Sequence, residues 1–390
     1  MAGKARRKIV VVGAGAFGGW TALHLLRMGA RVTLLDAWGP GNPRASSGGE
    51  GRAIRAIYGP DRIYSEMVLR AYHQWLALEK ESGQTLYTET GTLWLTGRDD
   101  SYVRASLSIL DDLGFPVEHL DLSVAARRYP QVHFGGVEQV FVEQRAGVLW
   151  ARKACEVVRD QFIAEGGTWR LASVGPGPIR VEGMDGLELS DGQLLKADDY
   201  VFACGPWLVS LFPKEFGASL HISRQEVYYF GTPAGSKEWG ADALPIWIDF
   251  ADKVHYGFPD VHGRGFKFAD DTRGVSHDPT STDRNATPAL LEAARAYIGR
   301  RFPGLKDAPL LEARVCQYSN SPDGNLIVDR HPEAANIWLA GGGCGHGFKL
   351  SPVIGEHLAR RILRNGVLEP TFAMARLGRI AKAKTQFKQG

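Results

Sequence analysis

The sequence predicts an α/β protein in which a Rossmann-like domain is interleaved with a second, α+β domain built on a mainly antiparallel β-sheet. Three observations predict this architecture: residues 8–36 have the pattern strand, Gly-rich turn, helix and strand; strands dominate residues 221–268; and a Gly-rich turn leads into a helix after residue 341. We expect residues 1–85, 146–215 and 310–390 to form the first domain, and residues 86–145 and 216–309 the second.

The first domain opens with a βαβ unit. Lys8–Val12 is an apolar run typical of a buried strand, and residues 19–28 have the pattern of a helix that Gly29 ends. A second strand over residues 31–35 leads to Asp36. The order of these elements places a turn and a helix N-terminus between two adjacent parallel strands.

The turn of this unit carries a dinucleotide-binding motif. Gly13, Gly15 and Gly18 fit G-x-G-x-x-G, in which glycines let the backbone approach a pyrophosphate at the helix N-terminus. A carboxylate at Asp36 accepts hydrogen bonds from ribose hydroxyls and repels a 2′-phosphate. The motif favours FAD or NAD over NADP. It does not distinguish FAD from NAD, because both contain the same ADP half. The alternative interpretation of the motif is a generic tight turn.

The other elements follow from periodicity and turn residues. In chain order we expect a helix over 61–81, a strand over 90–96, a helix over 152–165, a strand over 199–205, strands over 226–230 and 254–258, a polar surface loop over 270–287 and a helix over 288–301. From 310 to 366 the order is strand, turn, strand, Gly-rich turn and helix, with Asn365-Gly366 as the helix C-cap. Whether the polar loop is a lid stays open.

Composition excludes several classes of protein. The 46 basic and 43 acidic residues leave a net charge of +3 and no basic face, so we expect no nucleic-acid partner. No apolar run approaches the roughly 20 residues of a membrane span, which predicts a soluble, cytoplasmic protein without a membrane partner. Cys155, Cys204, Cys316 and Cys344 lie far apart without CxxC spacing, which argues against a metal site or a disulfide framework.

Three further segments, 46–59, 313–329 and 341–352, carry a family resemblance together with the N-terminal turn. With Cys316 in the second and Gly347-Phe348-Lys349 in the third, they resemble the monomeric sarcosine oxidase and N-methyltryptophan oxidase family, a branch of the D-amino-acid-oxidase-like flavoproteins. The resemblance is collinear over nearly the whole chain. It implies a monomeric FAD enzyme that acts on a small amine.

The resemblance also implies a covalent cofactor, attached through the 8α-methyl group of FAD to the sulfur of Cys316. By spacing alone, Cys316 would be a buried strand thiol. Arg52 matches an arginine beside the flavin ring, where a cation favours the anionic reduced form. The residues implied to bind FAD are Gly13, Ala14, Gly15, Phe17, Gly18, Asp36, Ser46, Ser47, Arg52, Val174, Gly205, Cys316, Gly345, Gly347, Phe348 and Lys349.

The resemblance assigns a substrate site as well. Arg55 and Lys349 match the residues that hold a substrate carboxylate, and Tyr256 and Trp247 match pocket residues. Without the motif context, Arg55 would be a surface ion pair and Lys349 a solvated lysine. A fixed carboxylate orients the C–H bond next to nitrogen for hydride transfer to the flavin, which leaves an imine.

Lys267 matches a lysine that stabilises the anion formed when oxygen accepts electrons. The sequence therefore predicts an FAD-dependent oxidase that releases H2O2, with Lys267 and Arg52 as catalytic residues. Two alternatives remain: a dehydrogenase of the same fold with another electron acceptor, and a noncatalytic FAD-binding assembly protein. An edge-strand lysine that guards against aggregation is the alternative interpretation of Lys267.

Three departures from the family pattern concern the substrate. Gly48 and Asp271 stand where histidines are expected, and Trp247 stands where a smaller apolar residue is expected. Asp271 either accepts a second ammonium group or caps the polar loop, and we favour the cap. Sarcosine becomes doubtful, and the candidates are N-alkyl amino acids, cyclic imino acids, glycated amino acids and large L-amino acids.

Overall fold

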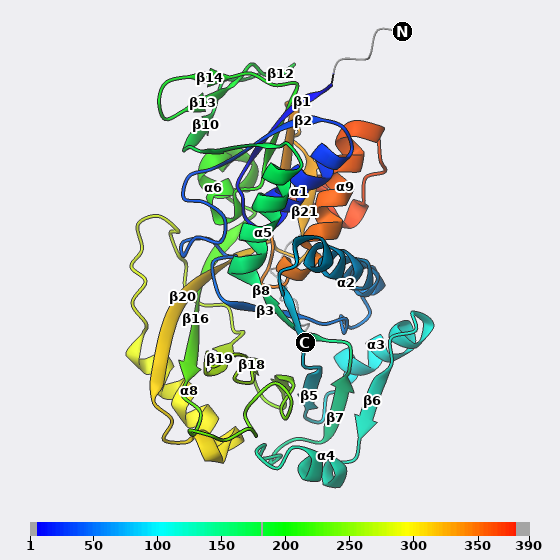
Figure 1. The fold of residues 1–390 in the computed structure, drawn as a ribbon, viewed down its shortest axis with the longest axis vertical. Helices are drawn as coiled ribbons and strands as arrows, with labels where there is room; N and C mark the ends of the chain where they lie inside the picture. The colour runs from blue at the N-terminus through cyan, green and yellow to red at the C-terminus, as the bar shows by residue number, and fades with distance from the viewer. Residues whose placement is uncertain (1–5, 181, 380–390) are drawn as a thin grey trace.

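The computed structural model describes residues 6–180 and 182–379. A six-stranded sheet with its helices occupies one half of the molecule, and an eight-stranded sheet occupies the other (Figure 1). The predicted α/β class, a Rossmann-like unit interleaved with a mainly antiparallel sheet, is confirmed.

The six-stranded sheet has the order β21-β22-β15-β1-β2-β9. Its strands are β1 (Lys8–Val12), β2 (Arg31–Asp36), β9 (Thr168–Leu171), β15 (Asp199–Phe202), β21 (Ile327–Arg330) and β22 (Ile337–Gly341). All neighbours are parallel except β21 and β22. Strand β1 lies in the middle and its apolar side chains are buried on both faces, which explains why the sequence there is a continuous apolar run.

Helices α1 (Ala16–Arg27), α5 (Ala151–Ala164) and α9 (Ser351–Arg364) pack on this sheet, and α2 (Arg62–Ser82) packs on α9. Helix α1 begins directly after Gly15, three residues before the predicted start, so the third motif glycine lies within its first turn. At Gly355 of α9, a Cβ would lie 2.6 Å from the backbone carbon of Trp20, so glycine allows α9 to pack closely on α1.

Smaller sheets connect the two halves. Strands β3 (Gly51–Ile54), β8 (Gly147–Trp150) and β4 (Tyr87–Glu89) form a three-stranded antiparallel sheet. Short strands β10 (Val174–Pro176), β13 (Leu187–Leu189) and β14 (Leu194–Leu195), the pair β11 (Ile179–Arg180) and β12 (Gly183–Met184), and helices η1 (Gly205–Trp207), α6 (Leu208–Leu211) and α7 (Pro213–Phe216) complete the first half.

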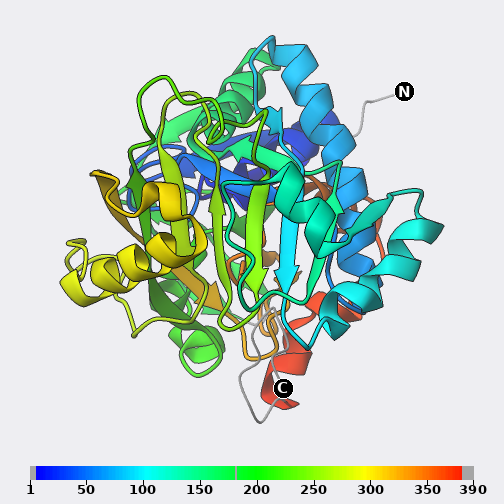
Figure 2. The same ribbon diagram turned by 90° about the horizontal axis from the view of Figure 1, so that it is seen from below.

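The eight-stranded sheet has the order β20-β16-β19-β18-β17-β5-β7-β6, with only β17 and β5 parallel. Its strands are β5 (Thr92–Thr96), β6 (Val117–Leu120), β7 (Gln139–Glu143), β16 (His221–Phe230), β17 (Ile246–Phe250), β18 (His255–Phe258), β19 (Phe266–Asp270) and β20 (Leu310–Asn320). Helix α8 (Pro288–Arg301) lies at one end of the sheet, and α3 (Ser101–Asp112) and α4 (Leu122–Arg128) at the other (Figure 2).

Strand β20 pairs with β16 over its whole length, so it belongs to the eight-stranded sheet. The domain limits given above stay a prediction. In the described ranges, no helix is long and apolar enough to cross a membrane.

Candidate active site

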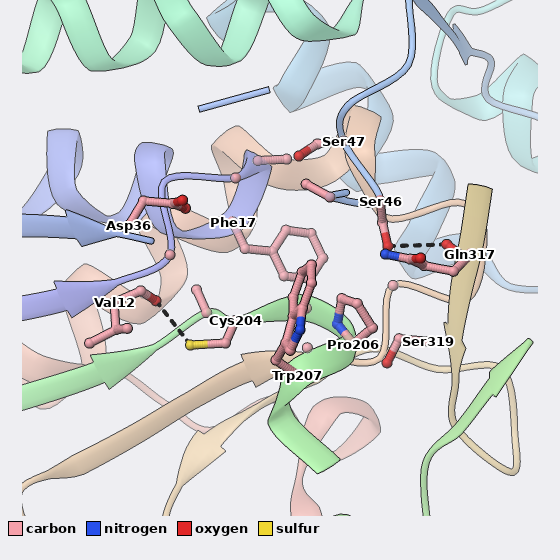
Figure 3. Close-up of a pocket in the computed structure, with 18 of the residues that line it drawn as sticks. Val12, Phe17, Asp36, Ser46, Ser47, Cys204, Pro206, Trp207, Gln317 and Ser319 are labelled. Carbon is pink, nitrogen blue, oxygen red and sulfur yellow. Dashed lines mark hydrogen bonds between the residues drawn. The ribbon is translucent and has the colours of Figure 1, made fainter. Parts of the chain in front are cut away.

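A cavity of about 320 Å³ lies where the carboxyl ends of β1, β2 and β15 meet. This edge of a parallel sheet is where such folds bind ligands. Asp36 lies at one end, Ser46 and Gln317 at the other, and Phe17 and Trp207 between them (Figure 3). Of the residues predicted to bind the cofactor, the lining includes Gly13, Gly15, Phe17, Asp36, Ser46, Ser47, Arg52, Val174, Gly205, Gly345, Gly347 and Phe348.

The Gly-rich turn forms a close-fitting wall of this cavity. Gly13 has a φ of 101°, and a Cβ there would lie 2.5 Å from the carbonyl oxygen of Ala203. A Cβ at Gly18 would lie 1.8 Å from the carbonyl oxygen of Gly13. Gly18 therefore does not line the cavity; it allows α1 to begin against the turn, so that the helix N-terminus faces the cavity.

We expect Gly18→Ala to lower the free energy of unfolding by about 1–3 kcal/mol, because the turn must shift to relieve the contact. Urea titration of the purified protein measures this change. Gly175→Ala is the matched control, since no atom lies within 4 Å of a Cβ at that position. Equal unfolding midpoints for the two variants would contradict the close packing at Gly18.

Asp36 is held rigidly at the ribose end. Its carboxylate accepts hydrogen bonds from the backbone N–H groups of Ala14, Trp38 and Gly39, each at 2.8 Å. Burial raises the pKa of Asp36, and these backbone donors oppose that rise. Ala14 thus positions Asp36, and a carboxylate with two oxygens keeps lone pairs for ribose hydroxyls.

Arg52 lies where the large cavity meets a second one. Its guanidinium donates to the carbonyl oxygens of Gly51 at 2.9 Å and Ser46 at 2.6 Å. Its Nη2 atom lies 3.9 Å from the sulfur of Cys316. Arg52 therefore places a fixed cation beside the sulfur that the sequence predicts to carry the cofactor.

The second cavity, of about 60 Å³, shares four lining residues with the first: Arg52, Tyr318, Gly345 and Phe348. It brings together four predicted site residues that are remote in sequence: Arg55, Tyr256, Lys267 and Lys349. A ligand there would lie next to whatever occupies this end of the large cavity.

Arg55 and Lys349 form one cationic corner of the small cavity. Both are 3% exposed. The Arg55 guanidinium lies 4.7 Å from the ring centre of Tyr58 and 5.2 Å from that of Trp94, and it donates to the carbonyl oxygen of Ile57. Lys349 Nζ donates to the Tyr58 hydroxyl at 2.8 Å. Burial, followed by the charge of Arg55, lowers the pKa of Lys349 well below its usual value.

Lys267, on β19, also lines the small cavity. It is 3% exposed; its Nζ donates to the carbonyl oxygen of Gly51 at 3.2 Å and lies 4.1 Å from the ring centre of Phe258. Burial and then the charge of Arg52 lower the pKa of Lys267 well below its usual value. An anion bound beside Nζ would favour the charged form again.

Asp271 lines the small cavity, contrary to our preference for a loop cap. It accepts a hydrogen bond from the Tyr318 hydroxyl at 3.3 Å and pairs with Arg273 at 3.6 Å. The cap is the preceding residue, Asp270, which accepts from the N–H of Thr272 at 2.7 Å. Burial raises the pKa of Asp271, and Arg273 opposes the rise.

Trp247, predicted to bind substrate, does not line either cavity. Its side chain is fully buried and stacks on Phe266 and Tyr297, with ring centres 5.9 and 5.8 Å apart. It faces the core between the eight-stranded sheet and α8, so any effect on the substrate is indirect. At Gly48, where a histidine was expected, a Cβ would lie 1.9 Å from the carbonyl oxygen of Asn42, so this loop has no room for a side chain.

His346 and the three cysteines other than Cys316 are held in surroundings that suit a structural role. His346 Nε2 donates to the carbonyl oxygen of Gly324 at 3.0 Å, so Nδ1 accepts from the Tyr58 hydroxyl at 3.2 Å. Burial lowers the pKa of His346 well below its usual value, which fits a neutral ring. Burial also raises the pKa of Cys155, Cys204 and Cys344, so these thiols are poorly reactive.

Two residues of the site were missed. Tyr318 lines both cavities and shares a hydrogen bond of 3.1 Å with Tyr256. It follows Cys316 by two positions on β20, and the alternation of a strand places both on one face, so the sequence held that signal. The second is Glu143, which lies fully buried next to Arg55. Its position at the end of a buried strand was the only sequence feature that could have indicated a role in the site.

The chain was compared with known proteins. The model of the FAD dependent oxidoreductase family matches residues 8–361. A peroxisomal sarcosine oxidase of Mus musculus is 30% identical over 386 residues, covering 96% of this chain and 97% of that protein. A monomeric sarcosine oxidase of Streptomyces avermitilis is 31% identical over 369 residues, covering 93% and 95%. An L-proline dehydrogenase structure from P. horikoshii has a TM-score of 0.82 at 21% identity and covers 96% of this chain and 98% of that one.

Proposed function

Because the chain belongs to the FAD-dependent oxidoreductase family, we propose that it oxidises the C–N bond of a small amine that bears a carboxylate. The predicted family and the prediction of an FAD-dependent amine oxidoreductase are confirmed. The proposal adds covalent attachment of FAD at Cys316 and oxygen as the electron acceptor. A monomeric state and a cytoplasmic location stay predictions.

The observation that carries the proposal is the cationic corner of Arg55 and Lys349 in a small cavity that adjoins the large one. The large cavity fits FAD: the Gly-rich turn and Asp36 suit the ADP half, and Arg52, Gly345 and Phe348 mark the end at which the ring would lie. The small cavity suits a small substrate, because its volume is only about 60 Å³ and its charged residues Arg55, Lys267 and Lys349 are buried.

Bound FAD supplies the hydride acceptor and passes the electrons on. The chain's own residues position the substrate. Arg55 and Lys349 pair with its carboxylate, and the walls exclude water, which strengthens these charge contacts. Tyr256 and Tyr318 also line the cavity and offer hydroxyls to the substrate. The resulting imine is hydrolysed by water.

Cys316 is proposed as the point of attachment, supported by the guanidinium of Arg52 at 3.9 Å from its sulfur. We expect the wild-type protein to remain yellow after acid precipitation, with the mass of one FAD on the Cys316 peptide. Cys316→Ser should release all its FAD into the supernatant. Cys204→Ser is the control, because Cys204 lines the large cavity and its loss should leave the attachment intact. Free FAD released from the wild type would refute the linkage.

Peroxide release during an aerobic screen of amines tests the proposed reaction. The screen should contain N-methyl amino acids, cyclic imino acids, glycated amino acids and large L-amino acids, each with its decarboxylated analogue. We expect activity only with carboxylate-bearing amines. Substrate-dependent bleaching of the flavin without peroxide would instead indicate a dehydrogenase, and absence of bleaching with every amine would favour a noncatalytic FAD protein.

A further inference from the structure

Glu143, at the end of β7, lies fully buried behind the cationic corner. One carboxylate oxygen accepts from the N–H of Ala56, next to Arg55, and the other from Trp94 Nε1 at 3.4 Å. The Arg55 guanidinium lies over the indole of Trp94, with its central carbon 5.2 Å from the centre of the indole ring. The carboxylate of Glu143 and the guanidinium of Arg55 thus share one neighbour, the indole of Trp94.

The corner combines two buried cations with this buried acid. The charge of Glu143 acts on Arg55, on Lys349 and on the hydroxyls of Tyr58 and Tyr102. Asp271 is the second acid that acts on Arg55 and Lys349, and it has its own cation in Arg273. Among the described residues, the cations whose charges are coupled to that of Glu143 are Arg55 and Lys349, the two that would bind the substrate.

We propose that Glu143 is the counter-ion of the cationic corner and that a bound substrate carboxylate takes over this role, so that Glu143 takes up one proton from solvent. The inference rests on the proposed function, because it needs an anion on Arg55 and Lys349. Glu143 acts through Arg55 and does not line the cavity, so it is a positioning residue.

The direction of the coupling follows from electrostatics. Burial raises the pKa of Glu143 to about 7, against the backbone N–H of Ala56 and the charge of Arg55. A second carboxylate nearby disfavours the ionised form and raises that pKa further. By linkage, affinity for an anion is highest below the free-enzyme pKa and falls as the pH rises through it, by about tenfold for each unit that binding raises the pKa.

The experiment uses the FAD-loaded enzyme with butanoate and cyclopentanecarboxylate, whose charge is constant between about pH 6 and about pH 9. Their dissociation constants come from changes in the flavin absorbance, and proton uptake comes from calorimetry in two buffers. We expect the wild type to take up close to one proton above neutral pH and to bind about 50- to 100-fold more weakly at the upper end of this range than at its lower end.

Glu143→Gln should lose the proton uptake and, at high pH, should bind these anions more tightly than the wild type. A purely structural role would give weaker binding instead. Glu143→Asp should keep the uptake, and Glu138→Gln, which removes an exposed acid just before the same strand, should match the wild type. Uptake that persists in Glu143→Gln would assign the proton to Lys349 or Asp271 and would overturn the proposal.

Two further outcomes separate this inference from the proposed function. Anion binding that is equally strong in Arg55→Ala would refute the carboxylate site itself, and with it the coupling. Binding that requires Arg55 but takes up no proton would refute only the role of Glu143. If Glu143→Gln does not fold, infrared difference spectra of the wild type and Glu143→Asp decide: the expected carboxylic-acid band must appear on ligand binding, and its absence overturns the proposal.

Discussion

Lys267→Met is expected to slow reoxidation of the reduced enzyme by oxygen by about 10²- to 10³-fold, the typical loss when one group that stabilises developing charge is removed. Electron transfer to oxygen forms an anion, and the Lys267 ammonium is buried on the cavity wall, where its charge is poorly screened. Methionine keeps the length of the side chain and removes only the charge. Reduction of the enzyme by the amine should change much less.

Stopped-flow absorbance measures the two half-reactions separately, with anaerobic reduction by substrate followed by mixing with oxygenated buffer. Lys253→Met is the control, because Lys253 is an exposed lysine on the turn before β18. Unchanged reoxidation in Lys267→Met would contradict the proposed role. Slow reoxidation already in the wild type would favour an acceptor other than oxygen.

Arg55→Ala is expected to raise KM by about 10- to 150-fold, which corresponds to the roughly 1.5–3 kcal/mol of a hydrogen bond to a charged group. Arg55 and Lys349 are the two cations of the corner, so the variant keeps one of them. Removing Arg55 also leaves Glu143 with less compensation of its charge. Lys349→Met should show a smaller increase, because burial lowers the pKa of Lys349 and so disfavours its charged form.

Steady-state peroxide assays give KM, and titration with butanoate gives the affinity of the free corner. Arg98→Ala is the control, because Arg98 is exposed two residues after β5 and does not line the small cavity. Equal affinity of Arg55→Ala and the wild type for the anion would refute the carboxylate assignment. A lower kcat with an unchanged KM would place Arg55 in the reacting geometry and not in binding.

The sequence by itself predicted those parts of the protein that depend on local pattern. The apolar run of β1, the Gly-rich turn, α1 and β2 are contiguous, so residues 8–36 contain the whole local pattern of the βαβ unit. The residues of the small cavity were found differently, through motifs in the resemblance. Arg55, Lys267 and Lys349 carried no local signal that distinguishes them from surface cations.

Only the tertiary structure decided which of these residues share a cavity. Lys267 meets Gly51 across 216 positions of sequence, and the hydrogen bond that places Glu143 behind Arg55 joins residues 87 positions apart. The same packing directs the side chain of Trp247 into the core, although the sequence predicted a pocket residue. It places Asp271 in the cavity lining, although the sequence favoured a loop cap. Local periodicity predicts which side chains share one face of a strand. Contacts between distant segments decide which strands pair and which charges meet in one cavity.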